Sequence, residues 1–201
     1  MIRTVVYISA FLTGLVVMAF EMLIGHYLNP FFGSSIMTWG AIISTVLVSL
    51  TIGYFWGGRL ADRFPSGKLI GGLLCLSALY LFALPLVKEP LLLRIATSVE
   101  DPRFGALLSA VLFAVPLMPL GMYCPFAIRL TITDRANSGA DSGIVYGIST
   151  IGSIVGTLSV AFYLVLFMGT RNITLLLAGV ALVAGVLNLT LVTRKTEGPV
   201  G

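Results

Sequence analysis

The sequence predicts an all-α integral membrane protein with about six transmembrane helices. Of its 201 residues, 58% are hydrophobic and only 10% are charged, and the mean hydropathy is +1.05. A soluble domain carries about 25% charged residues, so water would solvate this chain poorly. Six apolar runs approach the roughly 20 residues that a bilayer requires. They lack the period-2 alternation of a membrane barrel, which leaves helices.

The first three expected helices each end at a polar, turn-rich connection. They cover residues 4–25, 36–58 and 69–87. The connections after them combine proline with glycine or charged residues, which interrupt helices, and cover residues 26–35, 59–68 and 88–103. The last of these is the longest, and its stretch 91–99 predicts a short interfacial helix.

The last three expected helices complete a single transmembrane domain, residues 1–201. They cover residues 104–130, 143–168 and 173–193. A polar stretch separates the first two of them, and a tight turn at 169–172 separates the last two.

Basic residues are divided unequally between the two ends of such a bundle. The end with both termini holds Arg3, Arg59, Arg63, Lys68, Arg129, Arg135, Arg194 and Lys195. The other end holds Lys88, Arg94, Arg103 and Arg171. By the positive-inside rule this division predicts both termini in the cytoplasm, in the inner membrane of a prokaryote. It favours membrane orientation over nucleic-acid binding, because no Lys/Arg-rich tract occurs.

Motifs for catalysis or metal binding are absent from the sequence. There is no GxSxG, HExxH or P-loop pattern, and the glycine-rich stretches lie inside apolar runs. One histidine and two distant cysteines offer no metal-ligand spacing. We therefore expect no catalytic residue, no metal and no cofactor.

Small residues at a spacing of four mark places where helix backbones approach closely in a membrane. The second run has one such stripe, formed by Ala41, Thr45, Ser49, Gly53 and Gly57. The fifth run has two pairs on opposite faces, Gly143 with Gly147 and Gly152 with Gly156. The pattern predicts that the fifth helix packs on both sides, in the middle of the assembly, unless the spacing arises by chance.

The fourth run contains Pro116, Pro119 and Pro125. Each internal proline removes a backbone hydrogen bond and bends a helix. In a membrane, a freed carbonyl is tolerated beside protein or a wet cavity, so a broken helix indicates a transport pathway. Simple curvature is the alternative.

Glu21 is the only acid deep within an apolar run. It projects on the same helix face as Ala10, Gly14 and Gly25, which is the face that packs against other helices. An ionisable group there is costly and is a candidate for proton handling or for binding a cationic solute. Alternatively, Glu21 pairs structurally with His26, Arg171 or a backbone amide. His26 is a proton-handling candidate beside Glu21, or else an interfacial residue.

Two stretches resemble the transmembrane part of spermidine-synthase-like membrane proteins. The first runs from Glu21 to Pro65 and includes PFFGSSIMTWG and LTIGYFWGGRLADRFPS; the second comprises MPLGMYCPFAIRL and SGIVYGISTIGSIVGT. The resemblance implies a soluble aminopropyltransferase-type domain, which these 201 residues do not contain, so catalysis is not carried over. The family pattern commonly has Arg where His26 stands and Asn where Ser149 stands.

The segment GRLADR is similar to the loop between the second and third helices of major facilitator transporters. That resemblance implies a gating role for Gly58, Asp62 and Arg63; a solvated charged turn is the alternative. Six helices equal half of such a transporter, and a homodimer would restore twelve.

Together these features favour a half-size, transporter-like protein that handles a small cationic or polyamine-like solute in a cavity containing Glu21. The alternative is a non-catalytic membrane anchor that recruits a separate spermidine-synthase-like enzyme at the cytoplasmic face. The lipid bilayer is the expected environment in either case.

Overall fold

The computed structural model describes residues 2–131 and 138–190. Within these ranges every regular element is helical. In chain order the elements are α1 (Ile2–Phe32), α2 (Ile36–Arg63), α3 (Gly67–Ser98), α4 (Pro102–Ala114), α5 (Leu117–Gly121), α6 (Tyr123–Thr131), α7 (Ser138–Ser159), the π-helix η2 (Val160–Leu164), α8 (Val165–Phe167) and α9 (Thr170–Leu189).

The described residues confirm the predicted all-helical fold, and their long apolar helices are compatible with a multi-pass membrane protein. Five of them, with α7 continued through α8, are long and apolar enough to cross a membrane. A sixth span arises if α4 and the α5–α6 segment are taken together, because this pair passes the same test but bends by 53°.

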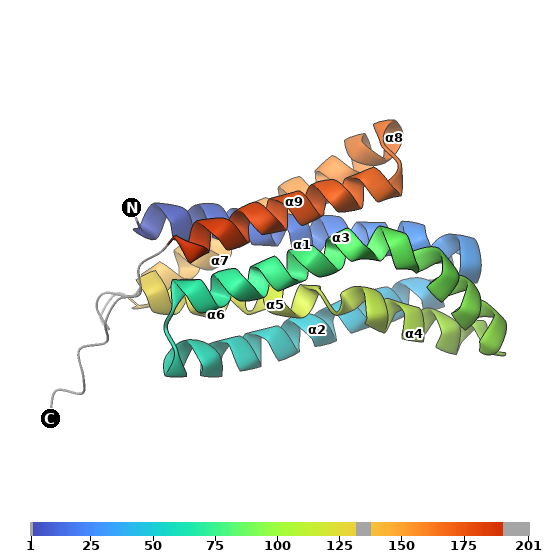
Figure 1. Cartoon of the computed structure of the whole chain (residues 1–201), viewed down its shortest axis with the longest axis horizontal. Helices are drawn as coiled ribbons and strands as arrows, with labels where there is room; N and C mark the ends of the chain where they lie inside the picture. Colours follow the sequence, from blue (N-terminus) through green and yellow to red (C-terminus); the bar gives the residue numbers. More distant parts are fainter. Residues whose placement is uncertain (1, 132–137, 191–201) are drawn as a thin grey trace, which may run out of the picture.

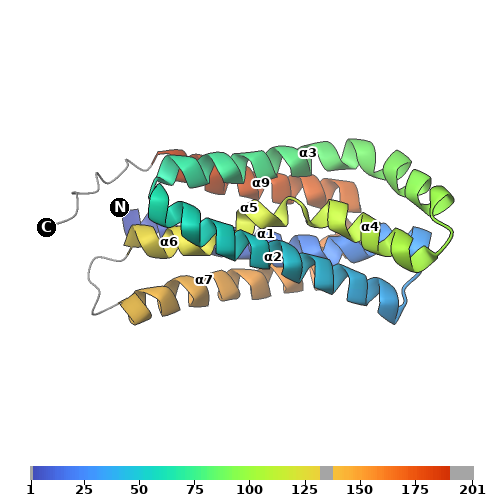
Figure 2. The ribbon, with the colours of Figure 1, turned by 90° about the horizontal axis from the view of Figure 1, so that it is seen from below.

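The helices lie side by side along one long axis (Figure 1). α1 occupies the interior and packs against α7, α9, α2, α4 and α6, while α3 packs mainly against α9. Viewed from below, α2 lies in front of α1, with α7 at one edge of the bundle and α3 at the opposite edge (Figure 2). Many side chains of α1 therefore lie inside the bundle.

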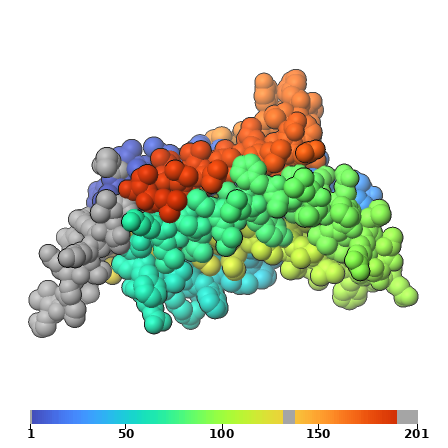
Figure 3. All heavy atoms as spheres, viewed as in Figure 1, coloured from blue at the N-terminus to red at the C-terminus, as the bar shows by residue number. Residues whose placement is uncertain are grey.

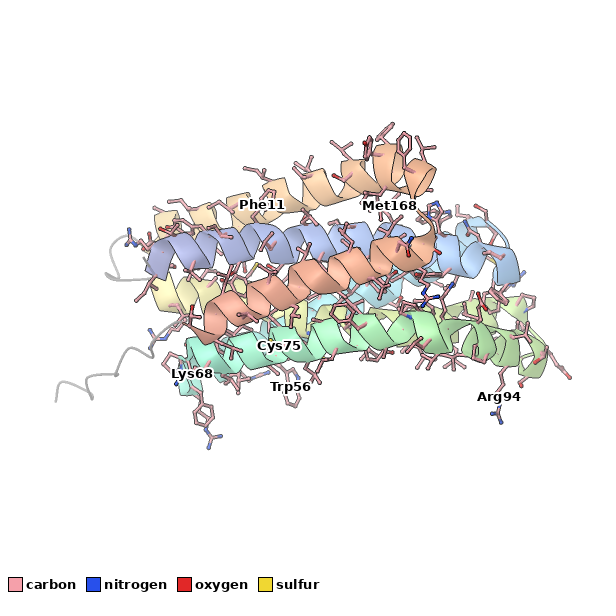
Figure 4. All side chains as sticks on the ribbon, turned by 45° about the horizontal axis from the view of Figure 1, so that its top comes forward. Phe11, Trp56, Lys68, Cys75, Arg94 and Met168 are labelled. Atoms are coloured by element: carbon pink, nitrogen blue, oxygen red, sulfur yellow. The ribbon has the colours of Figure 1, made fainter. Side chains whose placement is uncertain are left out.

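The interior is filled by large apolar side chains from α1, α4 and α6. Phe20, Phe113, Tyr123 and Phe126 are fully buried. The outer surface is also apolar, as lipid contact requires, and includes exposed Trp56, which points away from the bundle (Figure 4). The tip formed by η2 and α8 stands clear of the other helices (Figure 3).

Two helices extend well beyond the expected boundaries. The sequence predicts a loop from His26, but α1 continues to Phe32 with Pro30 in its last turns. Gly33 then ends the helix at φ 75°, and its N–H donates to the Asn29 carbonyl over 2.9 Å. Only glycine adopts this left-handed position at little cost.

The expected connection 88–103 is likewise wrong. α3 continues through Pro90 to Ser98, so the expected interfacial helix 91–99 is the end of this long helix. The true turn is short, because Asp101 caps α4 by accepting from the Arg103 N–H, and Pro102 occupies its first position.

Part of the expected topology lies outside the described residues. This applies to the end of the helix expected at 173–193, and to Arg135, Arg194 and Lys195.

Candidate functional site

Glu21 lies on the α1 face that is turned toward α2 and α7. One turn beyond it, Gly25 packs against the Trp39 ring of α2, since a Cβ there would lie 3.0 Å from Cη2. Two turns before it, Gly14 packs against the Ser149 backbone of α7. The prediction that Glu21 shares a helix-packing face with Gly14 and Gly25 therefore agrees with the packing of these glycines.

A small cavity of about 150 Å³ lies beside this face, between α1, α2, α5, α6 and α7. Val17 and Met18, four and three residues before Glu21, form part of its wall. Its polar lining consists of Thr13, Tyr54, Cys124, Ser149 and Ser153. Glu21 is not among the residues that line this cavity, and the nearest lining residues on its own helix are Met18 and Val17.

Glu21 itself is half-buried and makes no hydrogen bond or ion pair within residues 2–131 and 138–190. His26 does not serve as its partner, because His26 is exposed and its Nδ1 lies 3.0 Å from the Met22 carbonyl. No pairing of Glu21 with Arg171 occurs among these residues either. The carboxylate is left for a proton or a cationic group.

The gating candidates lie at the end of the bundle where α1 begins. Asp62 Oδ1 lies 3.6 Å from Arg129 Nε, which links α2 to α6. Arg63 stacks over the Phe64 ring with its Cζ 5.5 Å from the centroid. The side chains of Arg129 and Asp62 are 47% and 79% exposed, so water screens the attraction between them. Gly58 faces open space.

Four of the six glycines expected in helix packing are closely packed. A Cβ on Gly57 would lie 2.7 Å from Met122 Cα, and one on Gly53 would meet the Met118 carbonyl. A Cβ on Gly152 or Gly156 would meet backbone carbonyls of α1; Figure 4 shows Phe11 of this contact between α1 and α7. These glycines allow α2 to touch the broken helix and α7 to touch α1.

Gly143 and Gly147 are different, since a Cβ on either would have no neighbour within 4 Å among the residues that the structure describes. Their face of α7 is exposed along its length. α7 therefore lies at the edge of the described bundle, and the prediction that it packs on both sides is wrong for a single chain. Spacing alone gives two glycine faces but not the number of helices available to cover them.

The prolines stand where the fourth span breaks. α4 ends just before Pro116, Pro119 lies within the short α5, and Pro125 lies in the first turn of α6. Hydroxyl groups from neighbouring helices bind carbonyls around the break. Tyr80 Oη donates to the Leu112 carbonyl over 2.8 Å, Ser49 Oγ to Ala114 over 2.7 Å, and Ser77 Oγ to Pro116.

These hydroxyl donors were not identified from the sequence. Pro116 lacks the N–H that would reach Leu112 four residues earlier, so Tyr80 replaces the missing donor. The only sequence signal was a hydroxyl residue within each apolar run, which is common in membrane helices.

Two further polar clusters were not predicted from the sequence. Tyr123 Oη donates to the Val6 carbonyl, and Asn188 Nδ2 donates to Ser9 Oγ over 2.9 Å, which joins α1, α6 and α9. At the other end, Lys88 Nζ lies 4.5 Å from the centroid of the Tyr27 ring. Tyr27 Oη in turn donates to the Thr170 carbonyl.

Within the described part of the chain, no three His, Cys, Asp or Glu side chains are grouped so as to hold a metal ion. No family model matches the sequence, and neither a curated protein nor a solved structure is significantly similar to it.

Proposed function

We propose that this chain is a half-size, transporter-like membrane protein that handles a small cationic or polyamine-like solute, with Glu21 as the binding group. One observation carries the proposal: Glu21, a half-buried acid in an apolar helix, has no hydrogen-bond or ion-pair partner among the described residues, and Met18 and Val17, about one turn before it, line a cavity that contains polar groups. A carboxylate in a membrane is stabilised by a proton or a cation, and both are species that transporters move.

The surroundings of Glu21 support a site that changes shape. The cavity wall includes the short α5, where the fourth span is bent by 53°. Solute sites in transporters often lie at broken helices, because the unwound backbone there offers polar groups to the solute. The wall also includes α7, which rests on α1 through glycines rather than through interlocking side chains.

We propose further that the chain forms a homodimer through α7. α7 exposes Gly143, Gly147, Ile151 and Ile154 on one face. Glycines permit close contact between two helices, and two copies together have about twice as many spans, as in transporters built from repeats. We place both termini in the cytoplasm of a prokaryotic cell by the charge rule.

The test is uptake of radiolabelled putrescine, spermidine and methylammonium into proteoliposomes that contain the purified chain. We expect Glu21→Gln to lower uptake at least about tenfold, since a charged hydrogen bond contributes about 1.5 kcal/mol or more. Glu21→Asp keeps the carboxylate and should retain part of the activity. Glu89→Gln is the matched control, because Glu89 is 79% exposed.

Thermal unfolding of the same variants separates binding from folding. If Glu21→Gln lowers the melting temperature and leaves uptake intact, the residue is structural and the proposal fails. The proposal also fails if uptake is unchanged in both Glu21→Gln and Glu89→Gln.

A membrane anchor for a soluble enzyme remains the second candidate, and the exposed charges at the α2–α3 turn favour it. Arg59, Arg63 and Lys68 are exposed there, and Lys68 lies at the end of the bundle (Figure 4). Such a surface suits an acidic protein face. Recruitment of a soluble aminopropyltransferase-like protein to vesicles, lost in an Arg63→Glu and Lys68→Glu double variant, would support this candidate.

A further inference from the structure

The largest cavity described lies far from Glu21, at the end of the bundle where α1 ends and α2 and α4 begin. It has a volume of about 560 Å³, within the range of small-molecule sites. Its lining is polar for a membrane protein and includes Ser35, Thr38, Asp101 and Arg103. Phe32, Met37, Pro102 and Ala106 form its apolar part.

Asp101 and Arg103 bring opposite charges to this cavity without neutralising each other. Within residues 2–131 and 138–190, no ion pair involves either side chain. Residues two apart at the start of a helix point in different directions, which keeps them separate. Asp101 uses Oδ1 to cap the Arg103 N–H at 2.9 Å, and this bond fixes the carboxylate at the wall.

Among the described residues, two buried side-chain oxygens without a hydrogen-bond partner belong to residues one helical turn away from residues of the cavity wall. They are Asn29 Oδ1 and Ser109 Oγ, and Ser109 is fully buried. Asn29 precedes Phe32 by three residues, and Ser109 follows Ala106 by three, so each lies below a residue of the cavity wall.

Two contacts between α1 and α4 flank these residues along both helices. On one side of them, a Cβ on Gly105 would lie 2.6 Å from Phe32; on the other, the rings of Tyr27 and Phe113 lie 5.4 Å apart. Buried polar atoms are almost always hydrogen-bonded, so these two point to a ligand or its water beneath the cavity.

We propose that this cavity binds a small zwitterion of the amino-acid class. The ammonium group binds the free oxygen of Asp101, and the carboxylate binds the Arg103 guanidinium, whose planar fork matches a carboxylate. Ser35 and Thr38 supply hydroxyl groups at the α2 side. Asn29 and Ser109 bind the ligand or a water that it holds. This site does not depend on the proposed role of Glu21.

The test measures binding to the purified full chain in nanodiscs by calorimetry. The probes are glycine, β-alanine and γ-aminobutyrate, with ethylamine and propionate as ligands that carry one charge each. We expect at least one zwitterion to bind and both singly charged ligands to bind at least about tenfold more weakly, because each loses one charge-assisted contact.

Matched variants identify the residues. Asp101→Asn still caps α4, and with Arg103→Gln it should weaken zwitterion binding at least about tenfold. Glu100→Gln and Arg94→Gln are the controls, since these charges do not line the cavity, and Arg94 points away from the bundle (Figure 4). Both should leave affinity unchanged.

Three results would overturn the proposal. The first is that none of the three zwitterions binds the folded protein. The second is that Glu100→Gln or Arg94→Gln weakens binding as much as the variants of the cavity. The third is that Ser109→Ala leaves affinity unchanged, which would remove the two unpaired oxygens from the site; we expect this variant to weaken binding severalfold.

Discussion

Asn188 is a fully buried amide in a bundle of apolar helices, and its position explains how three distant parts of the chain are held together. Its Nδ2 donates to Ser9 Oγ over 2.9 Å and to the Ala184 carbonyl over 2.8 Å. Its Oδ1 lies 3.4 Å from Tyr123 Oη. Because lipid supplies no hydrogen bonds, this amide specifies how α1, α6 and α9 meet.

Replacing Asn188 should therefore loosen the bundle. We expect Asn188→Ala to lower the free energy of unfolding by about 1–2 kcal/mol, from lost hydrogen bonds and a small cavity. Thermal unfolding in detergent measures the effect. Asn172→Ala is the control, because Asn172 is exposed at the start of α9. Equal losses from the two variants would contradict a role for the buried amide.

Sequence reasoning found Glu21 and missed Asn188 for a physical reason. A carboxylate in an apolar run is costly wherever it points, so it stands out without a structure. An amide is less costly, and its importance depends on partners such as Ser9, 179 residues away. Asn29 and Ser109 were missed for the same reason.

The broken fourth span shows how one helix depends on its neighbours. Pro116 leaves the Leu112 carbonyl without its usual donor, and Tyr80 of α3 supplies a hydroxyl instead. The bend of 53° is thus accompanied by a hydrogen bond that holds α3 against it.

This arrangement predicts an interaction between two substitutions. Tyr80→Phe alone should cost about 1 kcal/mol of stability, since Leu112 loses its donor. In a Pro116→Ala background the new N–H can reach Leu112, so the same change should cost less by about 0.5 kcal/mol or more. Unfolding of the four proteins gives the coupling energy. Tyr163→Phe is the control, because Tyr163 is exposed. If Tyr80→Phe lowers stability equally in both backgrounds, the Tyr80 hydroxyl does not replace the missing N–H of Pro116.

Helix existence was easier to predict than helix length. Hydropathy over about 20 residues decides whether a segment enters a bilayer, and this is a local property. The ends of α1 and α3 were misplaced because His26 and Lys88 were taken to begin loops. Both helices continue past Pro30 and Pro90, since proline near a helix end disrupts little once its neighbours are packed.

At the scale of the whole molecule, the two glycine pairs of α7 have different partners. Gly152 and Gly156 contact the backbone of α1 within the chain, whereas a Cβ on Gly143 or Gly147 would have no neighbour within 4 Å in the described part of the chain. Periodicity predicted both pairs, and only the three-dimensional arrangement separates them. In the proposed assembly the second pair meets the same face of another copy, as a two-fold interface requires.

Substitutions within this one helix distinguish the two contacts. Gly152→Ile should destabilise the single chain by more than about 2 kcal/mol, because its side chain would meet the Phe11 backbone. Gly147→Ile should leave thermal unfolding of the monomer unchanged and lower the dimer fraction about tenfold or more, since a branched side chain keeps the two backbones apart. Native mass spectrometry from nanodiscs reports that fraction, and Gly179→Ile, on an open face of α9, is the control. A monomer in the unsubstituted protein, or a dimer that persists in Gly147→Ile, would exclude this face of α7 as the interface and leave it to lipid.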